Sequence, residues 1–255
     1  MIILIITIII LYIYNKFKPL YNESKILNIS NTENKKRHAN KDSKYAHYSK
    51  ITRRFPSLLK YPKYYLSSPI NFIVHENECL FIPKGWWHWV VSFANNNEYS
   101  FSINYWINKS NIKTPFITKN VYKSKINISN ILSNVFQKHK FRVWCDPENI
   151  KNKTISFNTF INNPYYKTCY LISLQHFKLS NVNEEIRKKL SAKILTPSFI
   201  KKSNIFEFNY WLNNGNIDTG LHVDDKSGYL CVHKGYKIIT LYPPTDTKYL
   251  YPHIL

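Results

Sequence analysis

The sequence predicts a mainly β domain with a few flanking helices. Short apolar runs bounded by turn residues fill two blocks, residues 44–107 and 205–245, and such runs are typical of β-strands. All five glycines fall within residues 79–106 and 205–245, where turns require backbone angles that other residues avoid. Four of the six tryptophans lie between Trp86 and Trp106. These three observations place the structured centre of the chain in the same two blocks.

Strands are predicted first, from the apolar runs of the N-terminal block: FIVHENECLFIP, WWHWVVSF and YSFSINYWI. Residues 128–150 then predict a short helix followed by a strand. Ser156 is a candidate N-cap for a further small helix, and residues 181–190 predict a surface helix. From Ile205 onward strands dominate again, as IFEFNYWL, TGLHVD, GYLCVH and GYKIITLYPP.

The net charge of +21 is unevenly spread along the 255 residues, a length that fits one sizeable domain with tails. Residues 1–64 hold 13 basic and 3 acidic residues, and residues 108–154 hold 10 and 2, so the strand-rich blocks are nearly balanced. Only five of the 36 basic residues are Arg, the residue whose fork reads phosphates and bases most specifically. Composition therefore does not favour a dedicated nucleic-acid-binding protein, although a basic protein that binds membranes or nucleic acid stays as an alternative.

The four cysteines are far apart and form no CxxC pair, which excludes a zinc ribbon: Cys79, Cys145, Cys169 and Cys231. A chain of this length does not need a disulfide scaffold. We therefore expect reduced thiols in a cytosolic setting.

The N-terminus opens with an unbroken apolar run of 14 residues, MIILIITIIILYIY, followed by Lys16 and Lys18. The run is shorter than the about 20 residues of a typical membrane span. A signal peptide would carry its charge before the run and small residues after it. The placement of the lysines favours a membrane anchor over residues 1–18 with the rest of the chain on the cytosolic side, and a basic flexible linker over 19–43. A mis-assigned start or a gene remnant is the alternative, and the protein would then be cytoplasmic or nuclear.

The tripeptide His222-Val223-Asp224 is the sharpest chemical signal. Alternate residues of a strand project from the same face, so its imidazole and carboxylate can bind two adjacent positions of one metal ion. A histidine from a distant strand would complete the two-histidine, one-carboxylate facial triad of non-haem iron. Alone, the tripeptide is common, and the surrounding sequence decides its meaning.

Residues 211–252, WLNNGNIDTGLHVDDKSGYLCVHKGYKIITLYPPTDTKYLYP, resemble the first half of a JmjC-type, cupin-like barrel. That family shows a tryptophan strand, a threonine before HxD, a G-x-K on the next strand, and then L-x-P-P-x-D and YLYP. Residues 79–106 resemble the second half, with LFIP-x-x-WWH-x-V-x-S and a strand ending N-x-W. The resemblance implies a double-stranded β-helix (cupin or jelly-roll) barrel and an oxygenase that depends on Fe(II) and 2-oxoglutarate.

The resemblance also implies roles for individual residues. Three residues match the iron ligands of the family: His88, His222 and Asp224. Lys237, fifteen residues after His222, matches the basic residue that pairs with the far carboxylate of 2-oxoglutarate, since a buried dicarboxylate needs a cation. Three further residues match polar contacts near the iron or the cosubstrate: Thr219, Asn104 and Tyr170.

One departure weakens the expected cosubstrate contacts. Many relatives carry an asparagine shortly after HxD, where this chain reads Asp225-Lys226-Ser227-Gly228. The resemblance is to small JmjC hydroxylases of protein side chains or RNA, and a catalytically inactive cupin-like module is the alternative.

The two halves stand in reversed order, because His88 precedes His222. The segment HYSKITRRFPSLLKYPKYY, residues 47–65, resembles the family's segment immediately after YLYP, and the chain itself ends YLYPHIL. This order predicts a circular permutation opened in an exposed loop. The permuted parts are the second half of the barrel, a linker and the first half: residues 44–107, 108–127 and 128–255. A remnant of tandem domains and a swapped dimer are the rival accounts.

Overall fold

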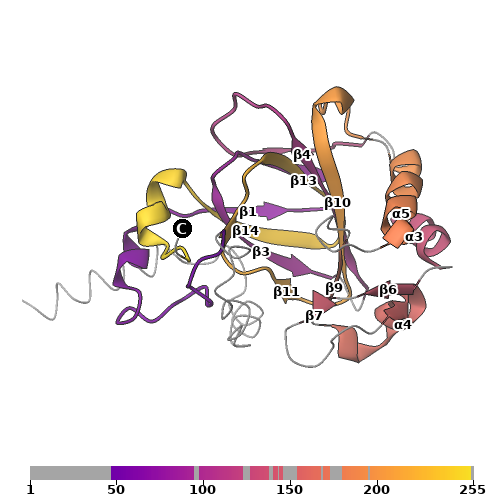
Figure 1. Ribbon diagram of the computed structural model, residues 1–255, viewed down its shortest axis with the longest axis horizontal. Helices are drawn as coiled ribbons and strands as arrows, with labels where there is room; N and C mark the ends of the chain where they lie inside the picture. The colour runs from indigo at the N-terminus through magenta and orange to yellow at the C-terminus, as the bar shows by residue number, and fades with distance from the viewer. Residues whose placement is uncertain are drawn as a thin grey trace, which may run out of the picture.

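The protein is described from a computed structural model, in which two antiparallel sheets face each other and helices cover one of them (Figure 1). Further statements on structure concern the residues that it describes: 47–94, 98–122, 127–137, 140–142, 144–145, 154–167, 169–172, 180–194 and 196–253. The expected anchor over residues 1–18 and the linker over 19–43 lie outside these residues. None of the helices within them is long and apolar enough to cross a membrane.

The smaller sheet carries five strands. In spatial order they are β1 (Ile70–Val74), β14 (Tyr236–Tyr242), β3 (Trp87–Phe93) and β11 (Ile217–Asp218), with β12 (His222–Val223) also paired to β3. Every pairing is antiparallel. β1 and β3, which come early in the chain, therefore alternate with β14 and β11, which come after residue 216.

The larger sheet carries seven strands. Their order is β5 (Phe116–Thr118), β2 (Glu78–Ile82), β13 (Ser227–Lys234), β4 (Ser100–Ile107), β10 (Ile205–Asn213), β9 (Cys169–Ile172) and β7 (Trp144–Cys145). A separate pair is formed by β6 (Lys140–Arg142) and β8 (Thr154–Ser156). The central strands β2, β13, β4 and β10 alternate between the first and the second half of the chain, so neither half forms a sheet of the barrel alone. The predicted mainly β, cupin- or jelly-roll-type fold is confirmed. The segment 108–127, predicted as a linker, supplies β5.

Alternation along the strands separates an inner from an outer face. Inner positions of both sheets meet in a compact apolar cluster between them: Val74, Leu80, Trp86, Val90, Leu230, Val232, Ile239 and Leu241. Outer positions of the larger sheet, such as Phe101, Ile103 and Tyr210, pack in a bigger core together with residues of the helices. Stability therefore rests mainly on the covered outer face, while the inner face has room for polar side chains.

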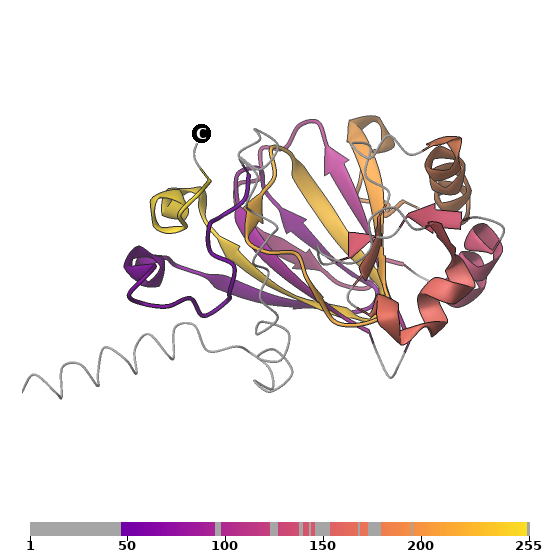
Figure 2. The same ribbon diagram turned by 60° about the horizontal axis from the view of Figure 1, so that its bottom comes forward.

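Three helices lie over the larger sheet: α3 (Ile128–Phe136), α4 (Phe157–Asn162) and α5 (Ser180–Lys193) (Figures 1 and 2). Asn127 caps α3 by accepting a hydrogen bond from the backbone N–H of Asn130, and Ser156 caps α4 in the same way from Thr159. The apolar stripe of α3, with Leu132 and Phe136 fully buried, faces the sheet. The predicted helices at these three places are confirmed, including the Ser156 cap.

The expectation of reduced thiols was wrong for the described cysteines. Cys79 on β2 lies directly opposite Cys231 on β13, with Cα atoms 4.0 Å apart, and the two form a disulfide within the outer core. Cys169 is also disulfide-bonded. The 152 residues between Cys79 and Cys231 explain why spacing along the sequence gave no sign of this pair. Only the register of two strands from different halves brings them together.

The beginning and the end of the described chain lie side by side. Residues 48–50 run antiparallel to residues 251–253, with Lys50 N–H donating to the Tyr251 carbonyl at 2.8 Å and His253 N–H to the Tyr48 carbonyl at 2.8 Å. The short helix η2 (Pro62–Leu66) and the short helix η5 (Pro244–Tyr249) also lie beside each other, far from α3 and α5 (Figure 1). The two segments pair like the strands of a β-hairpin, but no loop joins residue 253 to residue 48. Such a pairing is expected if a circular permutation opened the chain here, as proposed.

Candidate metal centre

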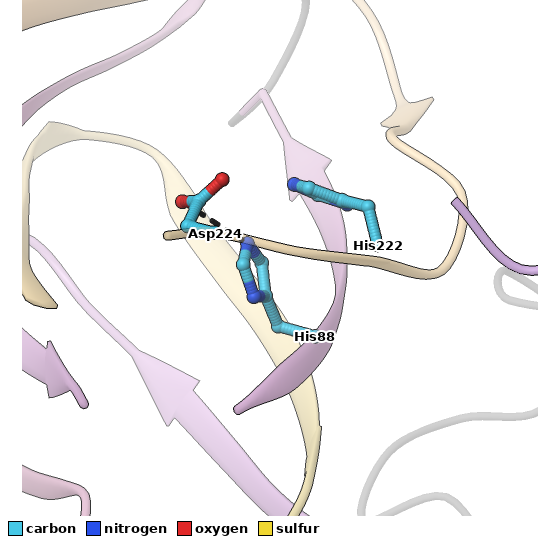
Figure 3. A group of neighbouring side chains, drawn as sticks. All are labelled: His88, His222 and Asp224. Carbon is cyan, nitrogen blue, oxygen red and sulfur yellow. Dashed lines mark ion pairs between the residues drawn. The ribbon is translucent and has the colours of Figure 1, made fainter. Parts of the chain in front are cut away.

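Three side chains of metal-binding type converge at one end of the barrel. His88 on β3 lies directly opposite His222 on β12, and Asp224 comes two residues later on the same segment (Figure 3). The two imidazole centroids are 4.0 Å apart, and Asp224 Oδ2 is 3.6 Å from His88 Nε2. One ligand atom from each residue can be chosen so that all three lie within 4.8 Å of one another. The structure thus brings together all three residues predicted as metal ligands.

Both imidazoles are held in the same way. His88 Nδ1 lies 3.1 Å from the carbonyl of Trp86, and His222 Nδ1 lies 3.0 Å from the carbonyl of Gly220. Each contact joins a histidine to the carbonyl two residues before it. Because a carbonyl only accepts, Nδ1 carries the proton in each ring and Nε2 keeps its lone pair. This is the tautomer and orientation that a metal-binding imidazole needs.

A tight turn aims His222 at the centre. Gly220 has a φ of 73°, a conformation that residues with a Cβ rarely adopt, and its N–H donates to Asp218 Oδ1 at 2.7 Å. The Asp218 carboxylate also accepts from the indole N–H of Trp89. On the far side of the His222 ring, the ring of Tyr48 stacks with a centroid distance of 5.4 Å. The Gly220 turn and the stacked Tyr48 ring therefore both restrain the position of the His222 ring.

Electrostatics keep His222 neutral. Desolvation by the surrounding protein, followed by the neighbouring His88, lowers the pKa of His222 to about 4. A neutral imidazole is the form that coordinates a metal ion. His88 is only 4% exposed, so a metal here would be reached through the mouth of the barrel beside Asp224.

This donor set fits a divalent first-row metal. Two imidazole nitrogens and one carboxylate on adjacent strands form the arrangement typical of non-haem Fe(II), which leaves coordination positions open for other ligands. Within the described residues, no other group of His, Cys, Asp or Glu side chains has metal-binding spacing. These three residues would hold the ion.

A buried lysine amine lies deeper in the same barrel. Lys237 on β14 is 2% exposed and donates a hydrogen bond to Ser92 Oγ, which lies 3.3 Å from Tyr170 Oη. Burial lowers the pKa of Lys237 to about 7. No carboxylate of the described residues is ion-paired with it. Two predicted cosubstrate residues, Lys237 and Tyr170, are thus connected through Ser92.

The same interior holds polar atoms that no described residue satisfies. The hydroxyls of Ser100 and Ser102 on β4, and Asn213 Oδ1 on β10, are buried and make no hydrogen bond within the described part of the chain. Such atoms are costly to bury unless a ligand or water satisfies them. A dicarboxylate would supply acceptors for the Lys237 ammonium and the serine hydroxyls, so the residues present fit 2-oxoglutarate.

The other two predicted cosubstrate residues take different positions. Thr219 Oγ1 accepts from Val90 N–H at 3.2 Å and can donate to the Gly220 carbonyl at 3.2 Å, so it connects its turn to β3. Asn104 is half-buried on β4, and a Cβ added at Gly228 on β13 would lie 3.0 Å from its Oδ1. Their contacts with a cosubstrate stay predictions.

Ser92, the last residue of the WWH-x-V-x-S match, and Tyr48 are site residues to which the sequence assigned no role. Ser92 lies on β3 four residues after His88, so strand alternation places it on the same face and could have indicated it. Tyr48 reaches His222 only because residues 47–49 pair with β12, and no spacing signals that contact.

Comparison with known proteins agrees with the fold and the site. A family model described as the cupin-like domain matches residues 13–113 and 118–255. A JmjC domain-containing protein of Acanthamoeba polyphaga mimivirus is 33% identical over 275 residues, which cover 92% of this chain and 43% of that protein. No solved structure matches the chain.

Two shorter matches point the same way. A lysine-specific demethylase of Arabidopsis thaliana is 33% identical over 76 residues, 28% of this chain and 14% of that protein. JmjC domain-containing protein D of Dictyostelium discoideum is 30% identical over 129 residues, 42% of this chain and 27% of that protein. The chain therefore spans less than half the length of these relatives. Since the family model covers nearly all of it, the chain belongs to the cupin-like (JmjC) family.

Proposed function

We propose that the protein is an Fe(II)- and 2-oxoglutarate-dependent oxygenase that hydroxylates a protein side chain or RNA. The observation that carries the proposal is the convergence of His88, His222 and Asp224, with both Nδ1 atoms engaged and both Nε2 atoms available. When bound, iron and 2-oxoglutarate supply the activation of O2, in the balance R–H + O2 + 2-oxoglutarate → R–OH + succinate + CO2.

Each residue has a physical task in this proposal. The triad holds the metal, and the carbonyls of Trp86 and Gly220 keep both imidazoles oriented. Lys237 pairs with the far carboxylate of the cosubstrate, and Ser92 with Tyr170 orients the ammonium. The apolar cluster of Val90, Leu230 and Ile239 keeps bulk water away from the interior.

The register of the sheet is compatible with this division of tasks. Lys237 pairs with Ser92, and Leu241 pairs with His88, so the two ends are four residues apart along the strands. That separation is about 13 Å at about 3.3 Å per residue. An extended lysine side chain and a five-carbon diacid together can bridge it.

The test is an anaerobic Fe(II) titration of the full chain, followed by 2-oxoglutarate turnover under O2 without added substrate. We expect one Fe(II) per chain and succinate formed in proportion to 2-oxoglutarate consumed. Asp224→Ala should abolish both, while His75→Ala, which removes an exposed histidine outside the site, should change neither. Iron binding without succinate would leave an inactive cupin-like module, and no iron binding would end the proposal.

A further inference from the structure

The loops around the metal end of the barrel form one continuous surface. Strand register brings Ile107 opposite both Ser227 and Ile205, and Ile82 opposite Gly228. The segments that extend these strands meet beyond the metal centre. We call them together the rim: residues 83–86, 108–115, 198–206 and 224–227.

Hydrogen bonds join the rim to the metal centre and its parts to one another. Gly85 N–H donates to the carbonyl of the ligand residue Asp224 at 3.2 Å, and Lys84 N–H donates to Ser227 Oγ at 2.9 Å. The indole N–H of Trp86, two residues before His88, donates to the Lys113 carbonyl at 3.0 Å. Lys109 N–H and Asn204 Oδ1 connect two further loops at 3.2 Å. The rim therefore borders the metal centre on the side of Asp224.

The rim is strongly basic. It contains six lysines: Lys84, Lys109, Lys113, Lys201, Lys202 and Lys226. All except the half-buried Lys226 are exposed, and within the described residues none of the six is ion-paired with a carboxylate. The rim's carboxylates are Asp225 and the metal-centre residue Asp224. This concentration of unpaired positive charge attracts a polyanion.

The rim also exposes aromatic faces. Phe206 is 52% exposed, and the Lys226 ammonium lies 4.6 Å from its ring centroid. Phe199 is 39% exposed and contacts the ring of Tyr229 edge-on. Unpaired bases stack on exposed aromatic rings while neighbouring lysines contact the phosphates. An acidic peptide would explain the lysines, but it gives no reason for flat apolar faces between them.

We propose that the rim binds single-stranded RNA and presents an unpaired nucleotide to the barrel. That this nucleotide is the substrate rests on the proposed function, whereas the binding does not. His88 is 4% exposed while the side chain of Asp224 is 30% exposed, so a reacting group would approach the metal centre from the side of Asp224, which the rim borders. A nucleotide in a single strand can be extended at little cost because no base pair has to break.

The experiment measures the fluorescence anisotropy of a labelled mixed-sequence 20-nucleotide RNA with the full chain, in EDTA and at several salt concentrations. Lys201→Ala with Lys202→Ala should weaken binding roughly tenfold and lower the salt slope by about 1.4, since each phosphate contact contributes about 0.7. Phe206→Ala should weaken binding roughly tenfold with an unchanged salt slope, because it removes stacking and no charge.

Matched controls lie away from the rim. Lys119→Ala with Lys167→Ala removes the same charge, and Tyr165→Ala removes an exposed aromatic ring; all three should leave the affinity within about twofold, as expected for changes that remove no contact with the strand. Equal losses in the rim and control variants, or RNA binding that survives all of them, would assign binding to another surface and overturn the inference. Polyglutamate or phosphatidylserine vesicles that bind as tightly as RNA would also overturn it.

The outcome is separable from that of the proposed function. Because EDTA removes the metal ion, the binding measurement does not depend on iron. If the rim variants bind RNA as tightly as the parent while Fe(II) binding and 2-oxoglutarate turnover are intact, the RNA-binding surface is rejected and the proposed oxygenase function is not. Rim-dependent RNA binding by a chain that binds no iron supports this inference and rejects the oxygenase.

Discussion

The two ends of the barrel interior are built differently. At the metal end, His88 and His222 are each oriented by the carbonyl two residues earlier, and Asp224 comes two residues after His222. At the deep end, Lys237, Ser92 and Tyr170 come from three strands that are far apart in the chain. At the metal end, each histidine is thus oriented by a contact within its own segment. The deep end forms only when both sheets have assembled, because Tyr170 lies in the larger sheet and Lys237 and Ser92 lie in the smaller one. Changes at the two ends should consequently have separable effects.

The largest effect is expected from removal of a metal ligand. His88→Ala or Asp224→Ala should weaken Fe(II) binding by more than roughly 100-fold, beyond what changes to orienting groups produce. Anaerobic calorimetric titration with Fe(II) measures this, and thermal unfolding of the metal-free variants tests whether they fold. Retention of Fe(II) affinity in both variants would mean that the metal binds elsewhere.

A smaller effect is expected at the deep end. Lys237→Met should weaken 2-oxoglutarate binding by about 10- to 100-fold, because a hydrogen-bonded charge partner is lost, and should leave Fe(II) affinity unchanged. Lys119→Ala serves as the control for an exposed lysine. Equal loss of metal and cosubstrate affinity would contradict the separation of the two ends.

The same lysine should make cosubstrate binding depend on pH. Burial lowers the pKa of Lys237 to about 7, so the free protein carries a neutral amine above that pH and must take up a proton to pair with a dicarboxylate. Affinity for 2-oxoglutarate should be constant below pH of about 7 and fall by up to about tenfold per pH unit above it. Calorimetry in buffers of different ionisation enthalpy should show proton uptake, which Lys237→Met should eliminate.

Lys237 also makes folding stability depend on pH. Stability rises with pH here, whereas a lysine whose pKa is raised by an ion pair makes stability fall as pH rises. The pKa of Lys237 is lower in the folded chain than in the unfolded one, so the unfolded state binds more protons between the two values. The free energy of unfolding of the ligand-free protein should therefore rise as pH increases above about 7. Urea unfolding of Lys237→Met should show less of this increase.

The smallest effect is expected from the relinking that tests the proposed circular permutation. Residues 253 and 48 pair across the open hairpin, so a short Gly/Ser linker from His253 to His47 can join them, with new ends opened after Thr118. Stability should change by only about 1 kcal/mol, because loop-closure entropy varies slowly with length. Light scattering should show a monomer before and after. A dimer that becomes monomeric on relinking would favour the swapped-dimer account.

The same contrast between local and long-range contacts decides which parts of the site could be predicted from the sequence. The pair of His222 and Asp224 was predictable because strand alternation places both side chains on one face, whereas His88 was assigned through the resemblance of the WWH block to the JmjC family. The disulfide of Cys79 with Cys231 was not predictable, because its partners meet through the pairing of β2 with β13. The stacking of Tyr48 on His222 and the contact of Lys109 with Asn204 depend on long-range pairing in the same way.

The alternation of early and late strands also sets the order of events during synthesis. β3 carries His88, yet all three strands that pair with it, β11, β12 and β14, come from residues after 216. At about 5 to 20 residues per second, roughly 6 to 26 seconds separate the emergence of β4 from that of β14. Throughout this interval the apolar strands β2, β3 and β4 have unpaired edges, which expose the nascent chain to aggregation. The barrel can close only after β14 has been synthesised, so chaperone supply during that interval would limit the yield of folded protein.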